Sequence, residues 1–119
     1  MAGFVKTTSA SLRNPERTRG RILSAALEEF ATNGFAGARV DVIAHRAAIN
    51  KRMLYHYFGS KEGLFREVLR LKMAERQALA EGLSGDPAES LTFWFEAACK
   101  DMDWIHLLEW EALEGKKKR

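Results

Sequence analysis

The chain has 119 residues, of which 46% are hydrophobic and 29% charged, and its net charge is +3. That length suffices for one domain, or for a small domain and the start of another, and folding would bury about two-thirds of the surface of the open chain. The charge content excludes a membrane protein, and the single cysteine, Cys99, cannot form an internal disulfide. No apolar run matches a signal peptide or a membrane span, so we expect a cytoplasmic protein without a membrane partner.

The charge is unevenly distributed along the chain. Residues 1–72 hold 13 Lys and Arg against 6 Asp and Glu, whereas residues 73–115 hold 2 basic against 10 acidic residues. The basic first part suits a polyanion such as nucleic acid, and the acidic second part would be repelled by one. Charge alone leaves a second interpretation open, namely a chance asymmetry of solvated surfaces.

The first 13 residues show no periodicity and are expected to form a flexible tail. The first predicted helix then follows Asn14, which can cap it, with Pro15 at its first position. Gly34 is expected to end this helix, because glycine tolerates the left-handed conformation found there. The apolar residues at helical spacing are Ile22, Leu23, Ala26, Leu27 and Phe30, and the arginines near the start are Arg13, Arg17, Arg19 and Arg21.

Two short helices and a long one are predicted next. The spacing of Val40, Ile43, Ala44 and Ala47 indicates the first, although Arg39 before it cannot cap. Asn50 is a good cap for the second, residues 51–58, whose inward residues would be Leu54 and Phe58. Ser60 can cap the third, which continues to about residue 81. Its apolar residues are Leu64, Phe65, Val68, Leu69, Met73 and Leu79.

Two further helices are predicted in the acidic part. Asp86 and Pro87 begin one of them, with Glu89 placed to complete a capping box, and its apolar face would hold Leu91, Trp94, Phe95 and Ala98. The last, about residues 104–113, would pack Trp104, Ile105, Leu108 and Ala112 on one side and end at Gly115. No run alternates as a strand does, so the predicted fold class is all-α.

Residues 39–61 have the layout of a helix–turn–helix, because two short helices flank a tight turn whose apolar Ile49 fits between them. An α-helix fits the DNA major groove, and long cations, tyrosine hydroxyls and imidazoles can reach bases or phosphates there. The outward face of residues 51–58 carries such donors, namely Lys51, Arg52, Tyr55 and His56. Pattern alone leaves open a two-helix hairpin with a solvated basic face.

The run VDVIAHRAAINKRMLYHYFGSKEGL at residues 40–64 resembles the DNA-binding signature of TetR-family transcriptional regulators. The resemblance extends over residues 15–114 and is most specific over 22–69. It implies a helix–turn–helix head at 15–70, after a flexible tail at 1–14, and the incomplete start of a helical ligand-binding and dimerisation domain at 71–119.

The resemblance also implies roles for single residues. Lys51, Arg52 and Met53 would face base edges, while Tyr55, His56 and Tyr57 would contact phosphates or the groove wall. Lys61 would grip a phosphate at the positive end of its helix. The other implied DNA-binding positions are Asn50 and Arg39, the latter standing where relatives often have Ser or Thr. Two further departures are Ala48, in place of the common turn glycine, and Arg52, in place of a small residue.

The implied partners are a palindromic double-stranded DNA operator, a second copy of the full-length protein and a small hydrophobic inducer, with repression as the default activity and no cofactor. Trp94, Phe95, Trp104 and Trp110 are candidate residues of a ligand pocket, with a core role as the alternative. Relatives are longer, so these aromatic residues, left without partners, would form an exposed patch that favours self-association.

Other classes of function have little support in the sequence. The three histidines lack metal-site spacing, Cys99 has no evident His partner, and Glu28 and Glu29 are expected on an exposed helix face. The glycines at 34 and 37 follow a helix and not a strand, so they do not form a phosphate loop. We therefore predict that the chain is not an enzyme and binds no metal. The alternative to a DNA-binding regulator is a truncated helical interaction module without DNA-binding activity.

Overall fold

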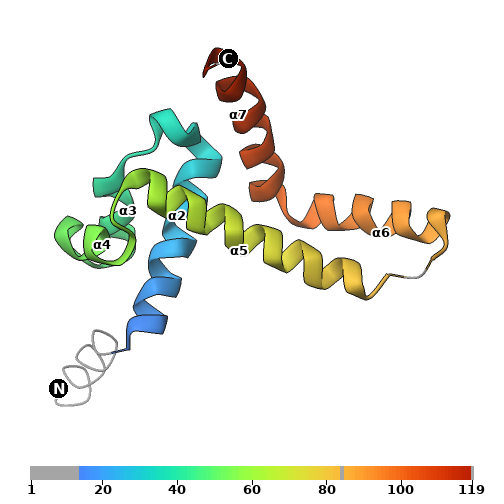
Figure 1. The fold of residues 1–119 in the computed structure, drawn as a ribbon, viewed down its shortest axis with the longest axis horizontal. Coiled ribbons are helices and arrows are strands. Elements are labelled where there is room, and N and C mark those ends of the chain that lie inside the picture. The colour runs from blue at the N-terminus through green and yellow to red at the C-terminus, as the bar shows by residue number, and fades with distance from the viewer. Residues whose placement is uncertain (1–13, 84, 119) are drawn as a thin grey trace.

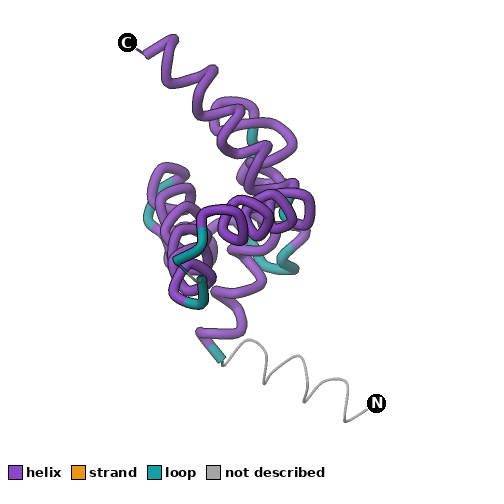
Figure 2. Tube along the Cα trace, turned by 90° about the vertical axis from the view of Figure 1, so that its right-hand side faces the viewer, coloured by secondary structure: helices purple, strands orange, loops and turns teal. Residues whose placement is uncertain are grey.

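The computed structural model describes residues 14–83 and 85–118, with side chains described as far as residue 115. The predicted tail and Arg13 therefore lie outside the described residues. The described elements are all helices: α2 (Pro15–Gly37), α3 (Val40–Arg46), α4 (Lys51–Phe58), α5 (Lys61–Glu81), α6 (Pro87–Lys100) and α7 (Met102–Lys118) (Figure 1). Short loops join them, and the described ranges contain no strand (Figure 2). The all-α prediction is confirmed.

Side-chain caps fix the starts of four helices where the sequence predicted them. Asn14, Asn50 and Ser60 accept hydrogen bonds from the first-turn amides of α2, α4 and α5, and Asp86 does the same for α6. Each cap satisfies an amide that has no partner inside its own helix. In the described part of the chain α3 has no side-chain cap, as the sequence predicted, because its N-cap position is occupied by Arg39.

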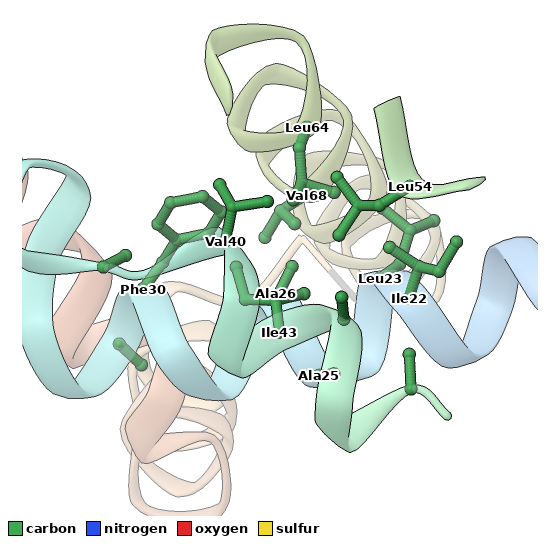
Figure 3. Packing of buried hydrophobic residues seen from close by; sticks show 14 of the residues in the cluster. Ile22, Leu23, Ala25, Ala26, Phe30, Val40, Ile43, Leu54, Leu64 and Val68 are labelled. Carbon is green, nitrogen blue, oxygen red and sulfur yellow. The ribbon is translucent and has the colours of Figure 1, made fainter. Parts of the chain in front are cut away.

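The centre of the molecule is a hydrophobic core formed by α2, α3, α4 and the first half of α5. Figure 3 shows side chains of these four helices meeting there. Residues at the centre are at most 1% exposed, and they are Ile22, Ala26, Phe30, Ile43, Leu54, Leu64 and Val68. Ile49 packs against this core from the turn between α3 and α4, as predicted. The core therefore fixes the orientation of α4 relative to α3.

Helix α7 adds to the same core. Trp104 and Leu107 are 7% and 2% exposed, and the contact between α2 and α7 is the most extensive between any two described helices. Three sequence predictions for this helix were wrong. Leu108 is 47% exposed and Ala112 is exposed, because Leu107 and not Leu108 faces α2. Gly115 does not end α7, since a single glycine costs a helix only about 1 kcal/mol.

Several apolar residues that the pattern assigned to buried faces are exposed. In α6, Leu91 and Phe95 are 74% and 70% exposed, and no residue of this fully described helix is buried. In α5, Met73 and Leu79 are 59% and 44% exposed. In Figure 1 α6 extends away from the core, so the described helices leave these side chains uncovered. The predicted apolar faces exist in the sequence, but the described chain supplies nothing to cover them.

A buried ion pair joins α5 to the junction between α6 and α7. Lys72 is 6% exposed, and its Nζ lies 2.6 Å from Oδ2 of Asp101 and 3.0 Å from Oε2 of Glu75. The other carboxylate oxygen of Asp101 accepts a hydrogen bond from the amide of Trp104, in the first turn of α7. Burial by itself would lower the pKa of Lys72, but the hydrogen bonds and charges of Asp101 and Glu75 outweigh it and raise that pKa. This contact fixes the direction in which α7 leaves the junction.

Candidate nucleic-acid interface

Helix α4 presents its polar face to solvent and its apolar face to the core. Leu54 is fully buried, and Phe58 packs against the core with the guanidinium of Arg19 4.9 Å from its ring centre. On the opposite side of the helix the predicted donors Lys51, Arg52, Tyr55 and His56 are all exposed. The local sequence produces this arrangement, because apolar residues four positions apart lie on one face of a helix.

The remaining predicted residues of α4 are less exposed. The side chain of Asn50 is occupied by its cap, with Oδ1 2.7 Å from the amide of Met53. Met53 is half-buried, and Tyr57 packs against the edge of the core with its ring centre 5.9 Å from that of His56. Tyr57 therefore supports the helix as well as standing beside its polar face.

The turn that joins α3 to α4 contains a left-handed residue. Ala48 has a φ of 59°, and the amide of Ile49 donates to the carbonyl of Ala44 at 3.0 Å. An alanine in this conformation is strained by about 1–2 kcal/mol, because its Cβ crowds the following carbonyl. The turn thus keeps the geometry that a glycine would adopt freely, and Ala48 itself is exposed.

The start of α3 is held by charged groups on both sides. Glu29 was predicted to be exposed, but it is buried, with only 4% of its surface exposed. Its Oε2 accepts a hydrogen bond from the backbone amide of Arg39 at 2.9 Å. The burial follows from this hydrogen bond and from the approach of Arg46, whose Nη1 lies 4.0 Å from the carboxylate. Glu28 remains exposed as expected, and its carboxylate lies 3.7 Å from the same nitrogen.

The Arg39 side chain reaches an acidic residue in the first turn of α3. Its Nη2 lies 3.0 Å from Oδ2 of Asp41. Desolvation opposes ionisation of Asp41, but the charge of Arg39, a backbone hydrogen bond and the hydrogen bond between the two side chains together lower the pKa of this carboxyl. Arg39 is 70% exposed in its side chain, so a DNA phosphate would compete with Asp41 for it.

Lys61, at the first position of α5, lies against the last turn of α2, which follows the kink at Gly34. Its Nζ is 3.4 Å from the carbonyl oxygen of Ala36 and 4.8 Å from the ring centre of Phe35. Phe35 in turn stacks edge-on against Phe65 of α5, with ring centres 5.2 Å apart. Lys61 is therefore held in one place on the surface and is only half-buried.

The four aromatic residues predicted as a pocket do not all lie together, although two of them flank one arginine. The guanidinium of Arg76 lies 4.9 Å from the ring centre of Trp94 and 5.4 Å from that of Trp104. Phe95 is exposed to solvent, and Trp110 lies at the far end of α7 against α2. A hollow of about 250 Å³ beside α6 has other residues in its walls, among them Leu79 and Phe93.

The contact of Trp110 and Glu114 with the end of α2 was not foreseen. Trp110 donates from Nε1 to the carbonyl of Ala31 at 3.1 Å. The carboxylate of Glu114 accepts the amides of Phe35 and Ala36 at 3.3 and 3.1 Å. These partners are 78 and 79 residues apart in the chain, so no local pattern could have indicated them. Among the described residues no cluster of His, Cys, Asp or Glu could hold a metal ion.

Comparison with known proteins identifies the family. Residues 22–68 match the family model described as bacterial regulatory proteins, tetR family. The chain is 41% identical over 108 residues to the HTH-type transcriptional repressor SCO4008 of Streptomyces coelicolor, a match that covers 86% of this chain and 53% of that protein. It is 45% identical over 64 residues to the repressor NicS of Pseudomonas putida, covering 54% of this chain and 30% of NicS.

The fold matches a solved structure as well. The crystal structure of SCO4942 from Streptomyces coelicolor, described as a transcriptional regulator, superposes with a TM-score of 0.68 at 42% identity. The superposition covers 82% of this chain and 54% of the SCO4942 chain. Residues 22–68 of the chain therefore belong to the TetR family of bacterial regulatory proteins. The chain spans about half the length of SCO4008 and about half the length of the SCO4942 structure. None of the described helices is long and apolar enough to cross a membrane.

Proposed function

We propose that the chain is a sequence-specific DNA-binding transcriptional repressor that inserts α4 into the major groove of its operator. The observation that carries the proposal is the outward face of α4, where four donor side chains are exposed on a helix whose other face is fixed by the core. The relatives that match this segment include transcriptional repressors. A groove-inserted helix needs this combination of reach and rigidity.

The proposal assigns separate tasks to the side chains of the interface. Lys51, Arg52 and Met53 would read base edges from the first turn of α4. Phosphate contacts would come from Tyr55, His56, Tyr57 and Lys61, with Arg39 adding another when it leaves Asp41. Base contacts determine sequence preference, whereas phosphate contacts fix orientation and affinity. The head would comprise residues 15–70, after a tail at 1–14, and residues 71–119 would begin the regulatory domain.

We also infer the partners of the whole protein from the same proposal. A palindromic operator and a homodimer go together, because a two-fold protein presents two α4 helices to two half-sites. A small hydrophobic inducer would act through the regulatory domain. Trp94 and Trp104 are the candidates for its site that the structure brings near one another, around Arg76.

The first experiment asks whether the chain selects a DNA sequence. Random duplexes are offered to the parent protein, to Arg52→Ala and to Arg66→Ala, and the bound duplexes are sequenced. Arg66 is an exposed arginine on α5 whose loss changes the net charge equally. We expect a changed base preference for Arg52→Ala alone. An unchanged sequence preference in Arg52→Ala would refute the role of Arg52.

The second experiment measures affinity against salt concentration in a mobility-shift assay. For about six phosphate contacts per half-site, log K should fall with log salt with a slope of about −5. Lys61→Ala should weaken binding to every duplex alike and reduce the slope by about 0.9. Failure to shift any duplex at low salt would refute DNA binding, and the chain would then be a helical interaction module.

A further inference from the structure

The last turn of α2, which follows the kink at Gly34, is held from two sides by residues far apart in the chain. We propose that Glu114 and Trp110 of α7 are positioning residues for Lys61. The end of α7 would then determine the affinity of the helix–turn–helix head for the DNA backbone. The inference rests on the proposed contact of Lys61 with a phosphate. It adds to that proposal two residues outside the helix–turn–helix segment.

The contacts that carry the inference meet at Ala36. The amide of Ala36 donates to Oε1 of Glu114 at 3.1 Å, and its carbonyl accepts from Nζ of Lys61 at 3.4 Å. The adjacent amide of Phe35 donates to the other oxygen of Glu114 at 3.3 Å. Hydrogen bonds to an ionised acceptor are stronger than neutral ones, so Glu114 restricts the position of this backbone segment. Ala36 thus links Glu114 of α7 to Lys61.

Trp110 contacts α2 at Ala31 and Gly34, just before the two residues that Glu114 binds. Its indole donates to the carbonyl of Ala31, and its ring covers Gly34 so closely that a Cβ at Gly34 would lie 2.7 Å from it. Gly34 has a φ of 73°, which breaks α2 and directs residues 35–37 toward Glu114. Trp110 and Glu114 therefore both pack against the kinked end of α2.

The position of Lys61 depends on this turn through two contacts. One is the carbonyl of Ala36, and the other is the ring of Phe35, 4.8 Å from Nζ. An ammonium group has three donors, so the bond to Ala36 leaves others for a phosphate. A lysine already held in place loses less side-chain entropy when it binds, and this pre-organisation favours binding.

The sign of the expected effect separates positioning from plain electrostatics. Glu114 is an acidic residue in the acidic part of the chain, so removing its charge would by itself strengthen binding to a polyanion. Removing a positioning contact has the opposite effect. Glu111 serves as the matched control, because it is an exposed glutamate one turn earlier on the same helix.

The test measures affinity of the full 119-residue chain for a labelled duplex of random sequence at low salt. Glu111→Ala should bind as tightly as the parent or more tightly. Glu114→Ala should bind about two- to tenfold more weakly, as expected from releasing one ordered side chain. Its salt slope should also fall toward that of Lys61→Ala. A Glu114→Ala variant that binds as Glu111→Ala does would overturn the inference.

A double-mutant cycle with Lys61→Ala distinguishes the two proposals. If Glu114 acts through Lys61, Glu114→Ala should have almost no effect in the Lys61→Ala background. Equal losses in both backgrounds would overturn the positioning role and leave the Lys61 contact intact. No loss for Lys61→Ala itself would overturn both.

Glu114→Gln guards against a variant that fails to fold. It keeps one accepting oxygen for the two amides, so it should recover most of the affinity that alanine loses. Tryptophan fluorescence and circular dichroism verify that each variant is folded. An amide variant that is folded like the parent but binds DNA as weakly as Glu114→Ala would contradict the hydrogen-bonding role.

Discussion

Replacing Gly34 by alanine should destabilise the chain by about 3–4 kcal/mol. Gly34 has a φ of 73° and a ψ of 176°, a backbone region that is essentially limited to glycine and costs other residues about 1–3 kcal/mol. The added Cβ would also lie 2.7 Å from Oε1 of Glu114 and from the ring of Trp110. Moving these side chains would weaken three hydrogen bonds to the turn, at about 0.5–1.5 kcal/mol each.

The measurement is urea unfolding followed by circular dichroism, with Gly20→Ala as the matched control. Gly20 lies in the same helix, and a Cβ there would have no neighbour within 4 Å. The control should therefore gain about 0.5–1 kcal/mol, because alanine restricts the unfolded chain without straining the folded one. A Gly34→Ala variant as stable as the parent would refute the argument that the turn needs glycine and that α7 fits it closely.

Three further predictions concern stability. Ala48→Gly should raise the free energy of unfolding by about 0.5–1 kcal/mol, because it relieves the left-handed alanine at the turn, and urea unfolding against the parent measures it. Asn50→Ala should lower the same free energy by about 1 kcal/mol, because α4 loses its cap; an unchanged urea midpoint would contradict this. The pKa of Lys72 is raised above its ordinary value of 10.5, so its ion pair stabilises fully below that pH and is lost as the pH rises through the folded pKa. The parent should therefore lose stability relative to Lys72→Met in urea titrations above pH 10.5, and a constant difference would argue against the pair.

Helix starts could be predicted because their signals are local. The caps at Asn14, Asn50 and Ser60 act on amides three residues away, so the sequence contains both partners. The outward donors of α4 follow in the same way from the spacing of Leu54 and Phe58. Their roles in reading DNA remain predictions, which the selection and salt experiments test.

Buried faces were predicted less well because a partner helix decides them. In α7 the apolar stripe is broad enough to include both Leu107 and Leu108, and packing against α2 buries only Leu107. In α6 the pattern indicated a buried face, yet Leu91 and Phe95 are uncovered by the described chain. Glu29 shows the reverse error, since only the fold brings the amide of Arg39 to its carboxylate.

The packing of α7 on α2 has a consequence for the order of folding. Contacts within the helix–turn–helix join residues close in sequence and can form early, whereas Trp110 meets Ala31 only after a loop of 79 residues has closed. During synthesis the end of α2 therefore stays uncovered until α7 has emerged. We expect a folding phase in which the head is formed and α7 is still undocked, detectable as a late change in tryptophan fluorescence after most of the helical signal has appeared.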